Sequence, residues 1–448
     1  MAYTFGMISL GCAKNLVNSE QMLYLLDEAG FHLVGDPDGA DFVIINTCGF
    51  IDSAKSEAID NILEMAELKK NGRLGKIIVT GCLPERYKEE IAEELPEVDA
   101  FLGVGSFSDI VTAVNACMEP DGPRCRFQAF AGNSEVIDEI PRVVSTGPGW
   151  AYLRIAEGCN NFCAFCAIPY IRGRYRSRKM ENILEEAKDL AAHGVKELIV
   201  IAQDITRYGT DLYGKCMLAR LCRELAAIDG IEWIRLHYLY PDQFDDELID
   251  EIASNEKIVK YLDIPIQHIN DGILKAMNRR GTGEEIRTLF RKLRDRIPGV
   301  VLRTSLIAGL PGEGEAEFEE LCDYLKEAQI ERVGVFPFSP EEGTPAAKMD
   351  HVDAETAQHR AAMIMELQAP IMDDFCDSFV GKTLKVLCEG TDEESGLCFG
   401  RSFADSPDID GLVYFEGACS AGEFALVSIE TAEDGFLYGK QTACEDEF

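Results

Sequence analysis

The stretch "EGCNNFCAFCAIP", residues 157–169, places three cysteines at spacings of four and three residues. It begins within "WAYLRIAEG" (150–158), an apolar run whose β-forming residues predict a strand. A zinc ribbon would need paired C-x-x-C elements, and a ferredoxin-type cluster would need a fourth cysteine close by. The sequence offers neither here, so the spacing disfavours both kinds of site and leaves open what the three cysteines would hold.

Around this stretch, residues 150 to about 343 alternate between short apolar runs and helical stretches such as "MENILEEAKDLAAHG". Six runs predict strands: "WAYLRIAEG", "ELIVIAQD", "WIRLHYLY", "YLDIPIQ", "VLRTSLIAG" and "RVGVFPFS". Such alternation is typical of a parallel sheet, and a complete barrel of this kind needs eight strands. We therefore predict a partial TIM barrel with the three cysteines on the loop after its first strand, at the face where active sites of barrels lie.

The first third of the chain contains a second set of three cysteines. The apolar runs "FGMISLGC", "ADFVIINTC" and "GKIIVTGC" end in Cys12, Cys48 and Cys82, separated by 36 and 34 residues, which fits strand–helix–strand units. They predict a Rossmann-like domain, in which the carboxyl ends of parallel strands meet at one edge. A thiol at a helix start is favoured as thiolate, so we expect three reactive cysteines there; three buried core cysteines are the alternative.

The rest of the sequence completes a three-domain α/β organisation. Residues 117–149 are rich in turn formers and predict a linker, whereas residues 353–381 predict a long helix that Pro370 could kink. Beyond Lys382, short strands and turns predict a small antiparallel β-barrel. The expected boundaries are 1–125 for the amino-terminal domain, 126–149 for the linker, 150–380 for the barrel with its trailing helix, and 381–448 for the terminal barrel.

Composition narrows the class of protein. The 448 residues include 43 basic and 79 acidic ones, a net charge of −36, which repels nucleic acid and favours basic partners. No apolar run approaches the length of a membrane span, and the first residues lack the features of a signal peptide. We therefore expect a cytoplasmic protein whose sixteen cysteines are reduced or bind metal, the ten outside the two triads serving as small core residues.

The C-x3-C-x2-C loop at the start of a β/α barrel resembles the radical S-adenosylmethionine (SAM) enzymes. That resemblance implies that Cys159, Cys163 and Cys166 hold a [4Fe–4S] cluster whose open iron binds SAM, with Phe165 beside the adenine. Gln203, Asp204 and Gln267 follow predicted barrel strands, where such enzymes contact SAM, although strand-end polar residues can also be simple turn formers. The element "IAGLPGE" (307–313) resembles the glycine-rich segment that such enzymes place near the adenosine.

The three domains together resemble the radical-SAM methylthiotransferases. The resemblance implies that Cys12, Cys48 and Cys82 hold a second [4Fe–4S] cluster and that the terminal barrel is a TRAM domain, which recognises substrate. It also implies an electron donor such as flavodoxin or ferredoxin. One SAM would methylate sulfur at the first cluster, and a second SAM would yield the radical that activates the substrate.

The family has two branches: one modifies an adenosine of transfer RNA, and the other modifies the β-carbon of an aspartate in the twelfth protein of the small ribosomal subunit. Residues 385–448 contain fifteen acidic residues and three basic ones, which disfavours RNA and suits a basic protein. The motifs "NTCGFIDSA", "DIPIQH" and "GRSFADSPDIDGLVYF" resemble the second branch. We therefore expect the ribosomal protein as substrate, with neither nucleic acid nor a membrane as direct partner.

Two features leave alternatives open. The basic run "YIRGRYRSRK" (170–179) could bind phosphate, although pairing with the SAM carboxylate or with acidic surface nearby is the preferred interpretation. His237 and His268 could be ligands or proton shuttles, and structural histidines are the preferred interpretation. A non-catalytic iron–sulfur carrier or scaffold remains the alternative from another functional class.

Overall fold

The computed structural model describes residues 3–119, 127–130, 137 and 139–442. The chain forms two compact units. Unit 1 comprises residues 1–145, 156–178 and 339–347, and unit 2 comprises residues 146–155, 179–338 and 348–448. The cysteine loop at 156–178 therefore belongs to the same compact unit as the amino-terminal domain. The domain boundaries expected from the sequence remain a prediction.

Unit 1 is built on a six-stranded parallel sheet of order β2-β1-β3-β4-β5-β6. Its strands are β1 (Thr4–Ser9), β2 (His32–Leu33), β3 (Phe42–Thr47), β4 (Lys76–Gly81), β5 (Ala100–Gly103) and β6 (Phe127–Ala129). Its principal helices are α1 (Ala13–Glu28), α2 (Asp52–Lys70), α3 (Cys82–Tyr87), α4 (Glu89–Glu94) and α5 (Ile110–Met118). The β6 strand lies within the expected linker, which is therefore not wholly irregular.

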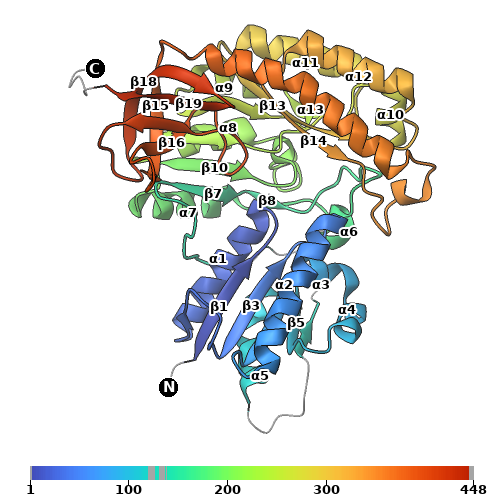
Figure 1. The fold of residues 1–448 in the computed structure, drawn as a ribbon, viewed down its shortest axis with the longest axis vertical. Coiled ribbons are helices and arrows are strands. Elements are labelled where there is room, and N and C mark those ends of the chain that lie inside the picture. Colours follow the sequence, from blue (N-terminus) through green and yellow to red (C-terminus); the bar gives the residue numbers. More distant parts are fainter. Residues whose placement is uncertain (1–2, 120–126, 131–136, 138, 443–448) are drawn as a thin grey trace. The chain divides into compact units, whose positions relative to one another are not determined.

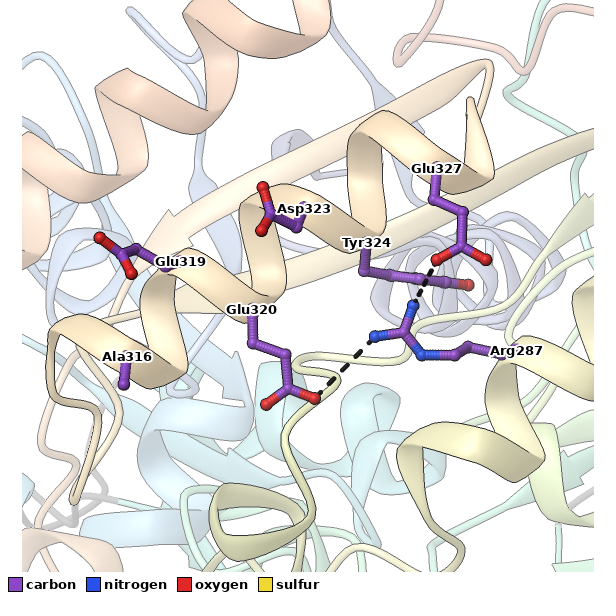
Figure 2. Close-up of a pocket in the computed structure, with 7 residues that line it drawn as sticks. All are labelled: Arg287, Ala316, Glu319, Glu320, Asp323, Tyr324 and Glu327. Atoms are coloured by element: carbon purple, nitrogen blue, oxygen red, sulfur yellow. Dashed lines mark hydrogen bonds and ion pairs between the residues drawn. The ribbon is translucent and has the colours of Figure 1, made fainter.

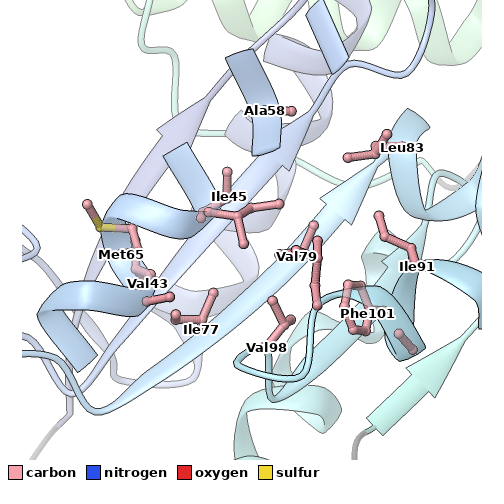
Figure 3. Packing of buried hydrophobic residues seen from close by; sticks show 14 of the residues in the cluster. Val43, Ile45, Ala58, Met65, Ile77, Val79, Leu83, Ile91, Val98 and Phe101 are labelled. Carbon is pink, nitrogen blue, oxygen red and sulfur yellow. The ribbon is translucent and has the colours of Figure 1, made fainter. Parts of the chain in front are cut away.

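The central strands of this sheet are buried on both faces. Along β3, Val43 and Ile45 join a core with Ala58, Ile62 and Met65 of α2 (Figure 3). The alternate residues Phe42 and Ile44 pack on the other face, with side chains from α1 and α5. Because successive strand residues point to opposite faces, one apolar run supplies both cores. This confirms the predicted Rossmann-like architecture.

Unit 2 contains the second parallel sheet, of order β14-β13-β12-β11-β10-β7. Its strands match the six predicted runs: β7 (Trp150–Arg154), β10 (Glu197–Ile201), β11 (Trp233–Leu236), β12 (Ile258–Asp263), β13 (Val301–Ala308) and β14 (Arg332–Pro337). Its helices include α7 (Met180–Ala192), α8 (Leu218–Ala226), α9 (Asp246–Ser254), α10 (Asp271–Ala276), α11 (Gly283–Arg296) and α12 (Glu315–Ala328). The sheet is open, as the six-strand count predicted for a partial barrel.

The carboxyl-terminal strands close into a small barrel of order β15-β16-β17-β19-β18. They are β15 (Thr383–Thr391), β16 (Cys398–Ser402), β17 (Val413–Glu416), β18 (Phe424–Glu433) and β19 (Phe436–Gln441). The pair β17–β19 is parallel and the other pairs are antiparallel, a mixed closure that the expected purely antiparallel barrel did not include. Helix α13 (Ala354–Asp377) precedes this barrel, contains Pro370 and packs against β14 (Figure 1).

A segment of the small barrel, residues 401–410, is attached to one face of the open sheet by buried polar contacts. Glu197 and Arg235 lie on adjacent strands with their side chains on the same face, according to the strand register. Glu197 accepts from Arg235 at 2.7 Å, and Arg401 lies 2.7 Å from the other oxygen of that carboxylate. Arg235 also donates to the carbonyl of Phe403. The two arginines and the glutamate are completely inaccessible to solvent.

The same face of the sheet makes further contacts with this segment. Tyr261 donates to Asp410 at 2.6 Å, and Arg332 pairs with Asp405 at 2.7 Å. His237, directly after β11, lies with its Nε2 3.1 Å from the hydroxyl of Ser406. These contacts fix the terminal barrel to the open sheet within unit 2.

Candidate functional site

The amino-terminal triad lies where three adjacent strands of unit 1 end. Cys12 is the N-cap of α1, Cys48 directly follows β3, and Cys82 begins α3. Strands β1 and β4 both pair with β3, so their carboxyl ends are neighbours. This placement agrees with the expectation that the three cysteines converge.

Two glycines permit the close approach of these loops. A Cβ atom on Gly11 would lie 3.0 Å from the Cβ of Cys48, and Gly11 has a positive φ of 93°. A Cβ atom on Gly49 would lie 2.9 Å from the carbonyl oxygen of Cys82. Any larger residue at either position would therefore push the cysteine-bearing loops apart.

Asn15, one turn into α1, connects the three loops. Its amide nitrogen donates to the carbonyls of Leu10 and Thr47, at 3.2 and 2.9 Å. Its side-chain oxygen lies 3.6 Å from the sulfur of Cys82 and also accepts from Arg172. Because one side chain holds the ends of β1 and β3 and contacts a thiol of the third strand, Asn15 is a main determinant of the triad's shape.

The three thiols act on one another electrostatically, and only one of them favours the thiolate. Burial raises the pKa of Cys48 to about 11, and the neighbouring Cys82 raises it further. Burial also raises the pKa of Cys82, despite the nearby Arg172. At Cys12 the effect of burial is outweighed by Lys14, Arg172 and backbone N–H groups, so its pKa is lowered. At Cys48 and Cys82 desolvation therefore outweighs the helix-start effect expected from the sequence, and it raises the pKa of both thiols.

The second triad, Cys159, Cys163 and Cys166, lies on a compact loop of unit 1. Strands β8 (Ala156–Glu157) and β9 (Arg176–Ser177) pair at its base, and the amide of Cys159 donates to Gly173 at 3.0 Å. The amide of Cys166 donates to the carbonyl of Cys163, also at 3.0 Å. Ala167 and Ile171, just after the triad, pack in one apolar cluster with Cys82. The two triads thus belong to one packed structure.

The basic run after this triad makes internal contacts. Arg172 donates to Glu157 at 2.9 Å and to Asn15, and Arg178 forms a two-point pair with Glu139. Arg174 stacks over the ring of Phe162, 4.4 Å from its centroid. Two of these arginines therefore neutralise nearby carboxylates, one of the roles preferred from the sequence.

The donor sets fit iron–sulfur clusters in their chemistry, since each triad offers three soft thiol ligands close in the fold. Among the residues that the structure describes, no three His, Cys, Asp or Glu side chains are already set at metal-ligand geometry. The assignment of Cys12, Cys48, Cys82, Cys159, Cys163 and Cys166 as cluster ligands therefore stays a prediction.

The proposed SAM-contacting residues differ in their surroundings. Asp204 is fully buried, accepts from Thr206 and Arg207 and caps a short 3-10 helix, contacts that indicate a turn-forming role. Gln267 has a left-handed backbone with φ of 70° and bridges to Leu306, a strained conformation of the kind found at functional sites. Phe165 and Gln203 are partly buried. The roles of all four remain predictions.

The histidines and the glycine-rich element form structural contacts. The backbone amide of Asn270 donates to Nδ1 of His268, and Nε2 of the same ring lies 3.3 Å from a carboxylate oxygen of Glu313. Glu313 also accepts from the amide of Gly309 and from Arg360, closing the "IAGLPGE" turn. His268 is completely buried, in line with the preferred structural interpretation.

Sequence reasoning did not identify Asn15 and Glu341. Glu341 is buried in unit 1, pairs with Lys55 at 3.0 Å and Arg86 at 2.9 Å, and accepts from the amide of Asp52. It thereby fixes segments that directly follow Cys48 and Cys82. Only the position of Asn15, three residues after Cys12, could have indicated a role, whereas Lys55 and Arg86, which pair with Glu341, lie more than 250 residues away from it in the chain.

A hollow lies on the outer helices α11 and α12 of unit 2. It is lined by Arg287, Ala316, Glu319, Glu320, Asp323, Tyr324 and Glu327 (Figure 2). Arg287 pairs with Glu327 at 2.9 Å inside it. It contains none of the residues predicted for the cluster or SAM sites. No helix in the described residues combines the length and the apolar character needed to cross a membrane.

Three family models match the chain. Residues 4–103 match an uncharacterised protein family, UPF0004; residues 153–325 match the radical SAM superfamily; and residues 380–441 match the TRAM domain. Among solved structures, the radical SAM methyltransferase TsrM from Kitasatospora setae has a TM-score of 0.57 at 16% identity, covering 77% of each chain. The cobalamin-dependent radical enzyme OxsB has a TM-score of 0.52 at 14% identity, covering 83% of this chain and 56% of that chain. Both show the fold alone.

Relatives of higher sequence identity were found among curated proteins. The ribosomal protein uS12 methylthiotransferase RimO of Acetivibrio thermocellus is 48% identical over 443 residues, covering 97% of each chain. The protein of the same name from Lachnoclostridium phytofermentans is 49% identical over 437 residues, covering 96% of this chain and 98% of the relative. At this identity over nearly the whole length, the chain belongs to the ribosomal protein uS12 methylthiotransferases, a family of radical-SAM enzymes.

Proposed function

We propose that this enzyme transfers a methylthio group to the β-carbon of an aspartate in ribosomal protein uS12, the twelfth protein of the small subunit. The observation that carries the proposal is the match over nearly the full chain to uS12 methylthiotransferases, with both cysteine triads present. The convergence of the first triad and the packing of the second beside it support the assignment of both.

Each triad has its own proposed task. Cys159, Cys163 and Cys166 would hold the [4Fe–4S] cluster that, when bound, reduces SAM and supplies the radical. Cys12, Cys48 and Cys82 would hold a second cluster that carries the sulfur to be transferred. Asn15 holds the loops of the first triad in place. An external electron donor such as flavodoxin or ferredoxin completes the proposal.

The charge of the terminal barrel supports a protein substrate over RNA. Arg401 is completely buried and paired with Glu197 and Glu389, so it cannot reach a phosphate. The barrel's exposed acids among the described residues are Glu393, Glu394, Asp408, Glu416, Glu423, Glu430, Glu433 and Asp434. RNA-binding barrels need a positive groove along the backbone, whereas this surface attracts a basic protein.

The test uses anaerobically reconstituted enzyme with SAM and dithionite. Unmodified uS12 and unmodified transfer RNA are offered separately, followed by intact-mass measurement of the protein and nucleoside analysis of the RNA. We expect a methylthio mass increase on a uS12 aspartate only. A methylthioadenosine in the RNA would contradict the substrate assignment, and absence of deoxyadenosine with either substrate would favour a non-catalytic iron–sulfur protein.

A further inference from the structure

Arg172, a member of the basic run 170–179, reaches the surroundings of the amino-terminal triad. Its side chain is almost completely buried, at 1% exposure, in unit 1. It donates to Glu157 at 2.9 Å and to the side-chain oxygen of Asn15, and that same oxygen lies 3.6 Å from the sulfur of Cys82. A residue of the second triad's loop therefore completes the surroundings of the first triad.

These contacts favour, for Arg172, pairing with an acidic group over binding of the SAM carboxylate, the two roles preferred for the basic run. A guanidinium that binds the SAM carboxylate must present its nitrogens to an open site. Both terminal nitrogens of Arg172 already have partners, Glu157 and Asn15, and the side chain has almost no solvent contact. Arg172 instead holds a buried positive charge close to the amino-terminal triad.

The physical consequence is electrostatic. A buried positive charge stabilises neighbouring thiolates and any anion bound to them much more strongly than an exposed charge does, because the local dielectric is low. Arginine suits such a place, since its planar fork stays charged and can contact several partners in fixed directions. A lysine would retain the charge but could not reproduce the fork.

We infer that Arg172 is a positioning residue of the amino-terminal triad, which holds a buried positive charge close to Cys82 and ties that triad, through Asn15 and Glu157, to the loop of the second triad. The inference rests on the proposed function, because it assigns Arg172 to the cluster proposed for the amino-terminal triad. It predicts that the charge of Arg172 favours the reduced, more negative state of whatever cluster the first triad holds.

The test is made in the full chain carrying Cys163→Ala, so that only the amino-terminal triad can hold a complete cluster. Arg172→Gln, Arg172→Lys and the matched control Arg174→Gln are each added to this background. Arg174 lies two residues away on the same loop and stacks on Phe162. The readouts are iron content, thermal unfolding and the midpoint potential from an EPR-monitored redox titration.

We expect Arg172→Gln to shift the reduction equilibrium about tenfold toward the oxidised state, which is about 59 mV for a one-electron couple. Arg172→Lys should shift it by less than half as much, and Arg174→Gln should leave it unchanged. An Arg172→Gln chain that keeps its melting temperature but holds no iron, while Arg172→Lys is loaded, would equally support the inference.

Three results would overturn it. An unchanged potential in fully loaded Arg172→Gln would show that the charge has no effect on the triad. Equal shifts, or equal loss of iron, in the Gln and Lys variants would make the residue's shape and not its charge decisive. If the Cys163→Ala background itself holds no iron, the two-cluster proposal fails before Arg172 is changed.

Discussion

Buried arginines occur in both units, but their partners differ. In unit 2, Arg235 and Arg401 share Glu197, and Arg401 has Glu389 as a second carboxylate. In unit 1, Arg172 has one carboxylate, Glu157, and otherwise donates to the amide oxygen of Asn15, which lies 3.6 Å from the sulfur of Cys82. The first arrangement satisfies its charges internally and is structural. The second arrangement pairs Arg172 with one carboxylate, so part of its positive charge can act on the nearby thiols of the amino-terminal triad. These thiols become negative only when they ionise or bind metal.

The same difference is visible in the effect on neighbouring acids. Burial alone would raise the pKa of Glu197, but Arg401 and Arg235 outweigh it and hold that pKa below its ordinary value. Around Arg172, burial prevails at Cys82, whose pKa stays raised. The two arginines therefore favour the ionised form of the Glu197 carboxyl, whereas burial disfavours the ionised form of the Cys82 thiol.

The largest expected effect is a loss of chemistry in unit 1, caused by a cysteine of the second triad and not by a cysteine that only packs in the fold. Cys163→Ala should abolish reductive cleavage of SAM, because only two ligands of the second triad remain. Deoxyadenosine formation under dithionite is the measurement. Cys322→Ala, at a partly buried cysteine outside both triads, is the control and should retain cleavage. Cleavage retained in Cys163→Ala would reverse the assignment of the triads.

Removing the carboxylate shared by the arginine pair of unit 2 should reduce the stability of the fold. Glu197→Gln leaves two buried guanidinium groups without their shared carboxylate, which should cost about 3–5 kcal/mol of unfolding free energy. Urea unfolding of the cluster-free chain measures it. Glu423→Gln is the matched control, because the Lys196–Glu423 pair is exposed and should contribute less than about 1 kcal/mol. Equal effects of the two changes would remove the contrast between the two units.

The pH dependence of stability should follow the lowered pKa of Glu197. A carboxyl whose folded pKa is depressed stabilises the fold above its ordinary value of 4.5 and loses that contribution as the pH falls through the folded pKa. Below pH 4.5 the unmodified chain should therefore lose up to about 1.4 kcal/mol per pH unit more than Glu197→Gln does. Unfolding curves collected between pH 3 and 6 compare the slopes; parallel slopes would contradict the shift.

The smallest effect concerns the contact between His237 and Ser406. Ser406→Ala removes a buried hydrogen bond between the sheet and the terminal barrel and should reduce stability by about 1 kcal/mol. Chemical denaturation quantifies the loss, while deoxyadenosine formation should be unchanged. A loss of SAM cleavage without a loss of stability would instead give His237 a role in the chemistry.

The fold was predictable because its signals are local. Alternating apolar runs identified all six strands of the open sheet, and the cysteine-ending runs identified three strands of the first sheet. The β6 strand escaped detection because three residues in a turn-rich segment carry no periodicity. The parallel pair β17–β19 was missed because strand order in a closed barrel depends on contacts distant in sequence.

The site was predictable only where residues act through spacing. Both triads are recognisable from their sequence context, but Arg172 and Glu341 act through partners that lie 157 and more than 250 residues away. Nor could the sequence show that burial would keep Cys48 and Cys82 protonated, since desolvation depends on the packed structure. Long-range polar contacts are thus the part of this site that structure adds.

The contacts of residues 401–410 bear on how such an enzyme can evolve. Because Arg401, Asp405, Ser406 and Asp410 each find a partner on the open sheet, the terminal barrel is not an interchangeable cassette. Replacing the barrel with a basic one by recombination would change the surface charge in a single step. It would also leave Glu197 and Arg332 without their partners, unless residues 401–410 were retained together with the sheet. Point substitutions of the exposed acids can change substrate preference gradually. Exchange of the whole domain requires that residues 401–410 and their partners on the open sheet be exchanged as well.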